Sequence, residues 1–209
     1  MDAIFIFLAL VATIIIGGIL FILSRTPGGQ NTSTKKIEGI NFVPSQMFMG
    51  SDGLSGLAIN ERTNQICLLT SPSTSPRLLP ITDLIGSYLI KNGELLGEGK
   101  RSFPKEIVTF SNEHNRRKEA LITSLNMAST QRADQRIDLL LVVHDQDEPI
   151  HIVNFLDMET KEGGILFEKA MSNATHWHYV LDGLILQADR LARLQSKTAP
   201  EKEMVETAP

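Results

Sequence analysis

An uncharged apolar run at residues 3–23 constrains this chain more than any other feature. As a helix the run is about 31 Å long at ~1.5 Å per residue, close to the ~30 Å hydrocarbon core of a bilayer. Most of its residues are Ile, Leu, Phe or Val, which insert favourably near the membrane centre. Its flanks lack the basic start and the small-residue exit of a cleaved signal peptide. We therefore expect residues 1–25 to form a transmembrane anchor.

The cations beside this run lie on one side of it. Arg25, Lys35 and Lys36 follow the run, whereas no Lys or Arg precedes it. Lys and Arg near a span favour the cytoplasmic side of a membrane. We expect a single-pass protein of the inner (cell) membrane, with its N-terminus outside and its C-terminal domain in the cytoplasm. The single cysteine, Cys67, agrees with a reducing compartment.

Polar segments flank the part of the chain that can fold. Residues 26–39 are predicted to be a flexible tether and residues 197–209 a disordered tail, because neither has enough apolar side chains to bury. Residues 40–196 then form one cytoplasmic domain. The net charge of −4 and the 6% aromatic content provide neither a basic surface nor stacking platforms, so nucleic acid is not an expected partner.

Pairs of apolar runs separated by short turns predict three antiparallel hairpins. In the second pair, Asn92-Gly93 favours the positive φ angles of a type I′ turn. Three prolines confine residues 71–80 to a loop or a sheet edge. The hairpins are 56–60 with 65–70, 83–91 with 94–97, and 137–144 with 150–156.

The segment between the second and third hairpins is predicted to change from loop to strand to helix. Residues 99–103 are typical of a loop, and the Ile-Val-Thr-Phe composition of 106–110 indicates a strand. Ser111 or Asn112 would then cap a helix that runs to about Ser129, because apolar residues recur there at helical spacing.

One long amphipathic helix is expected from about Ile165. A stripe of this width is typical of a helix that packs on a sheet, and the alternative is a coiled-coil seam that would make the protein a homo-oligomer. The stripe keeps an unbroken 3,4 spacing through Phe167, Ala170, Ala174, Trp177, Leu181, Leu184, Ala188 and Leu191.

Antiparallel strands followed by a C-terminal helix predict an α+β domain, a bent sheet or partial barrel capped by the long helix. The stretches GLSGLAINE (53–61), YLIKNG (88–93), PIHIVNFL (149–156) and ATHWH (174–178) resemble landmarks of uncharacterised bacterial proteins, of the prophage and mobile-element type, with a membrane-anchored PH-like domain. This resemblance implies a PH-like fold and transfers no activity. The chain departs from the family's pattern at 97–136, which is charged and helical where a Gly-rich loop is expected.

The histidines and the turn around Ser55 (residues 53–57, the serine turn) are candidate chemical sites. His176 and His178 lie two positions apart on a helix and point about 200° apart, so we interpret them as structural. His144 and His151, with the acidic turn 145–148, match no metal-ligand spacing. In the turn around Ser55 the second glycine comes one residue too early for a nucleophile elbow, so we interpret it as a turn that enters a strand. We therefore predict no catalytic residue, metal or cofactor.

Arg116, Arg117 and Lys118 form the densest cationic run. They are either a solvated helix face or candidate contacts to anionic lipid headgroups or to a protein partner. From these features we expect a membrane-anchored binding or regulatory module that acts on another membrane-associated protein. The alternatives are a lipid-sensing module and a membrane-tethered enzyme. A pocket that gathers two or more of His144, His151, Asp147, His176 and Glu113 would favour the enzyme.

Overall fold

The computed structural model describes residues 42–69, 75–132 and 135–205, all within one compact unit, Lys36–Pro209. The predicted anchor (1–25) and tether (26–39) lie outside the described residues. No helix in the described ranges has both the length and the hydropathy that crossing a bilayer requires.

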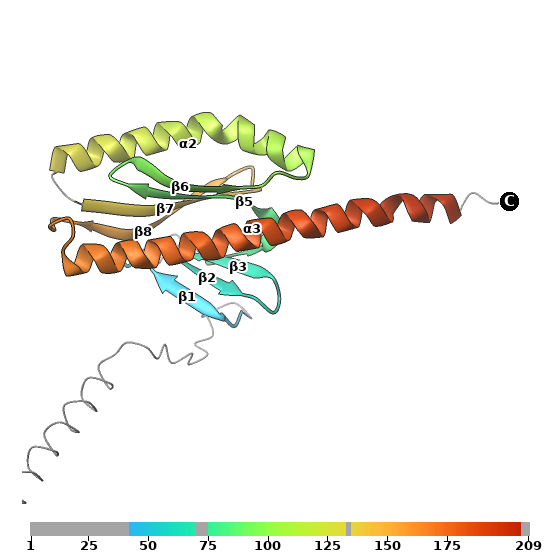
Figure 1. Cartoon of the computed structure of the whole chain (residues 1–209), viewed down its shortest axis with the longest axis horizontal. Coiled ribbons are helices and arrows are strands. Elements are labelled where there is room, and N and C mark those ends of the chain that lie inside the picture. Colours follow the sequence, from blue (N-terminus) through green and yellow to red (C-terminus); the bar gives the residue numbers. More distant parts are fainter. Residues whose placement is uncertain (1–41, 70–74, 133–134, 206–209) are drawn as a thin grey trace, which may run out of the picture. The chain divides into compact units, whose positions relative to one another are not determined.

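The described residues form an α+β fold with two antiparallel sheets and a long C-terminal helix (Figure 1). The first sheet has the order β1-β2-β3-β4 and the second has the order β6-β5-β7-β8. The strands are β1 (Gln46–Met49), β2 (Gly56–Asn60), β3 (Gln65–Leu69), β4 (Arg77–Pro80), β5 (Leu84–Lys91), β6 (Glu94–Lys100), β7 (Gln135–Val143) and β8 (Ile150–Met158). The helices are the short 3-10 helix η1 (Ile81–Asp83), α2 (Lys105–Arg132) and α3 (Ile165–Val205).

All three predicted hairpins are confirmed. Strand β2 pairs with β3, β5 with β6, and β7 with β8, each antiparallel. Asn92 and Gly93 have φ angles of 50° and 77°, as a type I′ turn requires. Strand β4 takes the sheet-edge alternative foreseen for residues 71–80, since it pairs only with β3 at the border of the first sheet.

The second sheet is buried on both faces. Leu139 and Leu141 of β7 belong to a core cluster with α3 and the first sheet, whereas Leu140 and Val142 belong to a cluster with α2. Apolar residues are therefore needed on both sides of β7, which explains its unbroken run of apolar side chains. In Figure 1, α2 lies along one side of this sheet and α3 along the other.

Helix α2 corrects the prediction of a strand at 106–110. The helix begins at Lys105, so Ser111 and Asn112 lie inside it and cap nothing. Strands β6 and β7 both run antiparallel to β5 and therefore parallel to one another, and parallel strands need a long crossover, usually a helix. Ile107 packs against the sheet in this crossover. Strand β6 also extends to Lys100, so the predicted loop at 99–103 is shorter than expected.

Helix α3 begins where it was predicted, and its stripe is buried inside the chain. Trp177 is 5% exposed and lies with Phe48 and Phe155 in the largest core cluster. This burial supports sheet packing over a coiled-coil seam. The helix continues to Val205, past the expected boundary at Ser196 and into the predicted tail. The tail was predicted to be disordered because it is polar, but its Lys and Glu residues have a high helix propensity.

A buried ion pair joins α3 to the segment that leads into α2. Arg101 pairs with Asp189, and their side chains are 1% and 7% exposed. The other Asp189 oxygen accepts hydrogen bonds from the Ser102 N–H (2.9 Å) and Oγ (2.7 Å). Because each of these charges is paired and hydrogen-bonded, the desolvation of both is offset.

Candidate functional site

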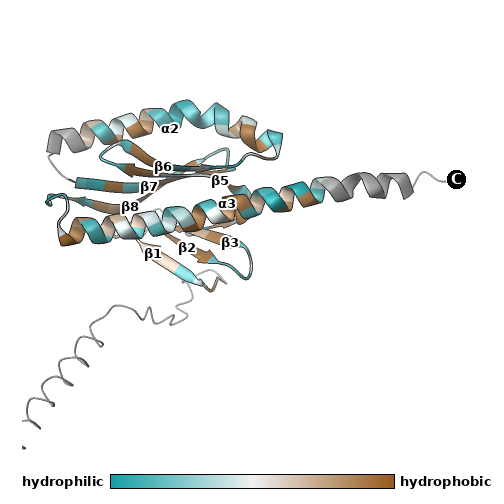
Figure 2. Ribbon diagram, in the orientation of Figure 1, coloured by the Kyte–Doolittle hydropathy of each residue, from teal (hydrophilic) through white to brown (hydrophobic). Residues whose placement is uncertain are grey.

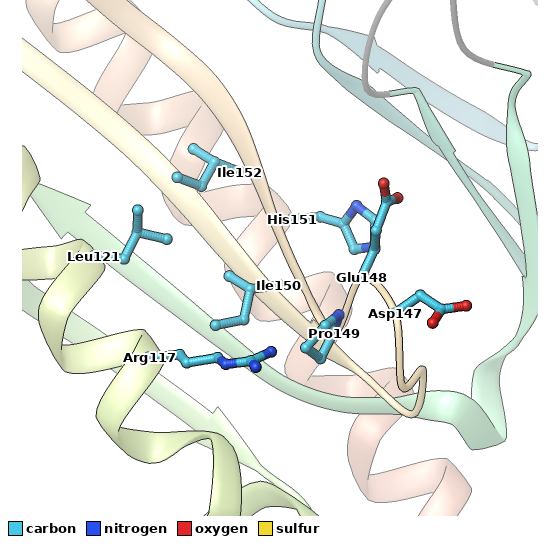
Figure 3. Close-up of a pocket in the computed structure, with 8 residues that line it drawn as sticks. All are labelled: Arg117, Leu121, Asp147, Glu148, Pro149, Ile150, His151 and Ile152. Atoms are coloured by element: carbon cyan, nitrogen blue, oxygen red, sulfur yellow. The ribbon is translucent and has the colours of Figure 1, made fainter.

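An open groove with a cavity volume of about 630 Å³ lies between α2 and the N-terminal half of β8. Alternate residues of a strand point to opposite faces, so Ile150 and Ile152 turn toward α2 and His151 turns away (Figure 3). The lining residues are Arg117 and Leu121 of α2, Asp147 and Glu148 of the β7–β8 loop, and Pro149, Ile150, His151 and Ile152.

The backbone of β8 has a free edge along this groove. Strand β8 is the outer strand of its sheet. The Val143 N–H donates to the Pro149 carbonyl (2.9 Å), so the backbone groups of every second residue, including Ile150 and Ile152, face away from β7. Among the described residues, these outward groups of Ile150 and Ile152 have no hydrogen-bond partner.

The same edge is covered two residues further along. The Asn154 carbonyl accepts the Ser51 N–H (2.8 Å), and the Asn154 N–H donates to Ser55 Oγ (3.0 Å). The carboxylate of Asp52 accepts the Ser55 N–H (2.9 Å) and holds the loop in this position. The serine turn thus enters β2, as the sequence suggested, and it limits the open edge to Ile150–Ile152.

His151 carries an unsatisfied polar atom beside the groove. Its side chain is buried, with 4% of the residue exposed, and Nε2 has no hydrogen-bond partner among the described residues. Burial lowers the pKa of His151, and the positive charge of Arg77 lowers it further, against the raising effect of Glu148. The imidazole is therefore held neutral, and its unsatisfied Nε2 is shielded from solvent.

The acidic β7–β8 loop is mostly committed to structure. Arg77 of β4 pairs with Asp145 and with Glu148 (3.0 Å), which ties the first sheet to this loop. Asp145 Oδ1 also accepts the N–H groups of Asp147 (2.9 Å) and Glu148 (3.0 Å). By contrast, the exposed carboxylate of Asp147 and the exposed guanidinium of Arg117 make no ion pair among the described residues.

The three candidate cations have different surroundings. Arg117 lines the groove, and Arg116 is exposed outside it. The Lys118 Nζ lies 4.2 Å from the centroid of the Tyr88 ring, and burial lowers the pKa of Lys118. Consecutive helix residues point about 100° apart, so the three side chains point in different directions.

His178 and His144 have structural contacts, whereas His176 is exposed on α3 and its ring lies edge-on to that of Trp177. His178 Nδ1 lies 3.0 Å from Ser87 Oγ in the buried contact between α3 and β5. His144 packs edge-on against Phe110, with ring centroids 4.8 Å apart. Within the described part of the chain, no three His, Cys, Asp or Glu side chains gather where they could hold a metal ion.

The groove meets the condition that would favour an enzyme, because it gathers Asp147 and His151. The charges that shift the pKa of His151 are mainly those of Arg77, Glu148 and Asp145, which belong to the structural ion pairs of the β7–β8 loop. The sequence suggested Asp147 and His151 only as metal ligands or as groups of an enzyme site. It did not identify Leu121, Ile150 and Ile152 as groove residues, and the one available indication was the short Asp147-Glu148-Pro149 turn before a strand.

Comparison with known proteins returns no match: no protein-family model, no curated protein and no solved structure corresponds to this chain.

Proposed function

We propose that this protein is a membrane-anchored cytoplasmic module that binds and regulates another membrane-associated protein through the groove between α2 and β8. The single observation that carries the proposal is the free backbone edge at Ile150 and Ile152, next to apolar side chains and to Arg117, which has no ion pair among the described residues. Exposed strand edges are usually blocked in proteins that do not use them for binding.

A PH-like architecture is the finer form of this proposal. Two antiparallel sheets packed with a C-terminal helix support it. In this view α2 is an insertion between β6 and β7 that covers one face of the second sheet and forms a wall of the groove.

The membrane anchor and the orientation rest on the apolar run and its one-sided cations. A reporter enzyme that is active only outside the cytoplasm, fused after Pro209, tests them. We expect an inactive fusion. An active fusion would place the groove outside and remove the proposed class of partners.

Photo-crosslinking in the native cells tests the binding function. A photoreactive phenylalanine analogue replaces Asp147, which lines the groove and is exposed. The matched control replaces Tyr179 of α3, which is 69% exposed. We expect a discrete adduct with another membrane-associated protein from position 147 only. No adduct from position 147, or the same adducts from both positions, would overturn the proposal.

A membrane-tethered enzyme is the second candidate, favoured because the neutral His151, whose Nε2 has no hydrogen-bond partner among the described residues, lines the groove together with Asp147. In that case the captured protein is a substrate, and His151 would accept a proton from it. Intact mass spectrometry of the captured protein separates the two functions. A mass change that disappears in the His151→Gln variant would support the enzyme, and an unchanged mass in both supports the binding module.

A further inference from the structure

We infer that the groove takes an extended peptide segment with an acidic side chain, which adds as a new strand to the free edge of β8 and pairs with Arg117. This inference rests on the proposed binding function and names the chemistry of the partner. The partner would be a protein with an exposed extended segment, and neither a folded surface nor a lipid.

The backbone of β8 sets the length and the pairing of the segment. The outward N–H and C=O groups of Ile150 and Ile152 match two residues of an added strand. The Ser51–Asn154 hydrogen bond ends the open edge on one side, and the β7–β8 loop ends it on the other. A segment of about five residues therefore spans the free edge, since a strand rises about 3.3 Å per residue.

The two sides of β8 differ in chemistry, and an added strand would present alternate side chains to each. The side toward α2 offers the apolar side chains of Leu121, Ile150 and Ile152, together with the guanidinium of Arg117. It selects an apolar residue and an acidic residue two positions apart. On the opposite side the His151 ring is buried, with Nε2 shielded from solvent, so we expect no side-chain preference at the position between them.

Charge complementarity selects an acidic segment over a basic one. Arg117 has no ion pair among the described residues, so an incoming carboxylate meets a cation that needs no rearrangement. A charge-assisted, two-pronged contact between guanidinium and carboxylate is the strongest pairing available here. Asp147 stands at the loop end of the groove and disfavours a second acidic residue there.

The first experiment measures peptide selection by the purified full-length protein in detergent. The probe is an array of acetylated, amidated pentapeptides in which each position in turn is Glu, Lys, Val or Thr and the others are randomised. We expect selection of Glu at one position and Val two positions away, with no preference at the position between them. Arg117→Glu should replace the preference for Glu by one for Lys, whereas the matched control Arg190→Glu, an exposed arginine of α3, should preserve it.

The second experiment tests strand addition with N-methylated versions of the best peptide. Methylating the amides that face β8 should weaken binding about tenfold or more, because each loses a backbone hydrogen bond. Methylating the alternate amides should have little effect. Equal loss in both registers, or no selection by the array, would overturn strand addition.

The outcomes also separate this inference from the function on which it rests. A position-147 adduct without peptide selection means that the partner docks as a folded surface, so the inference fails while the binding function stands. Binding of vesicles containing phosphatidylglycerol that is weakened equally by Arg116→Glu and Arg117→Glu would overturn the inference in favour of lipid headgroups. Absence of both the adduct and peptide selection overturns both proposals.

Discussion

The two long helices cover opposite faces of the second sheet in different ways. Helix α3 buries an unbroken apolar stripe in the largest core cluster. Helix α2 buries only Ile107 and Leu125 among its described side chains, with Phe110, Leu121 and Ile122 partly covered. In Figure 2 the outward side of α2 is coloured largely as hydrophilic. We conclude that α3 is a core element, whereas α2 is a thin cover that leaves the edge of β8 open.

We expect the largest loss of stability from truncating a side chain in the apolar stripe of α3. Trp177→Ala should lower the free energy of unfolding by about 3–5 kcal/mol, because the ring fills the core between the two sheets. Denaturant unfolding of the full-length protein in detergent measures this. Tyr179→Ala, at a side chain that is 69% exposed, should stay within about 0.5 kcal/mol of the wild type. Similar losses at both positions would mean that the outer face of α3 is also packed.

Truncating the buried side of α2 should cost less. Leu125 is 7% exposed and sits in the smaller cluster, so Leu125→Ala should cost about 2–3 kcal/mol, the low end of the range for Leu→Ala. Met127→Ala, at a residue that is 63% exposed, is the control in the same unfolding measurement. A loss as large as that of Trp177→Ala would show that α2 is as much a part of the core as α3.

Two glycines with the same φ angle test how firmly α2 is held next to the Asn92-Gly93 turn. Gly93 and Gly163 both have φ of 77°, so alanine at either position costs about 1–2 kcal/mol from the left-handed conformation alone. A Cβ on Gly93 would also overlap the backbone of Asn126 in α2, whereas a Cβ on Gly163 meets nothing within 4 Å. Gly93→Ala should therefore cost more than Gly163→Ala. Equal losses of stability would mean that α2 shifts at no cost to make room for a Cβ at position 93.

We expect the smallest change in stability from a change in pH. Burial lowers the pKa of both His151 and His178, with Arg77 also lowering that of His151 and Asp182 opposing the shift at His178. At these two positions the folded protein thus binds fewer protons than the unfolded chain as the pH falls below about 6.5. Stability should be complete above that pH and fall as the pH decreases through the folded-state values. His178→Asn should reduce this dependence, and an unchanged pH profile would contradict the assignment.

The sequence predicted the elements that are encoded by local patterns. The Asn92-Gly93 turn and the alternating runs around it identified the hairpins, and the 3,4 spacing around Trp177 identified α3. The prediction for the start of α2 was wrong because Ile107 and Phe110 lie in a short apolar run that is compatible with a strand as well as with a helix. Of the candidate cations, only Arg117 reaches the groove, since the direction of each side chain depends on how α2 rotates against the sheet.

The sequence by itself determined the apolar run of residues 3–23, the three hairpins and the amphipathic C-terminal helix, because each depends on residues close together in the chain. The strand order and the groove were decided only by the tertiary structure. Strand β8 has a free edge because β7 inserts beside β5 after the α2 crossover, which no local pattern encodes. The groove is likewise lined by residues far apart in the sequence, such as Arg117 of α2 and His151 of β8. The Arg77–Asp145 pair that fixes the β7–β8 loop connects residues 68 positions apart.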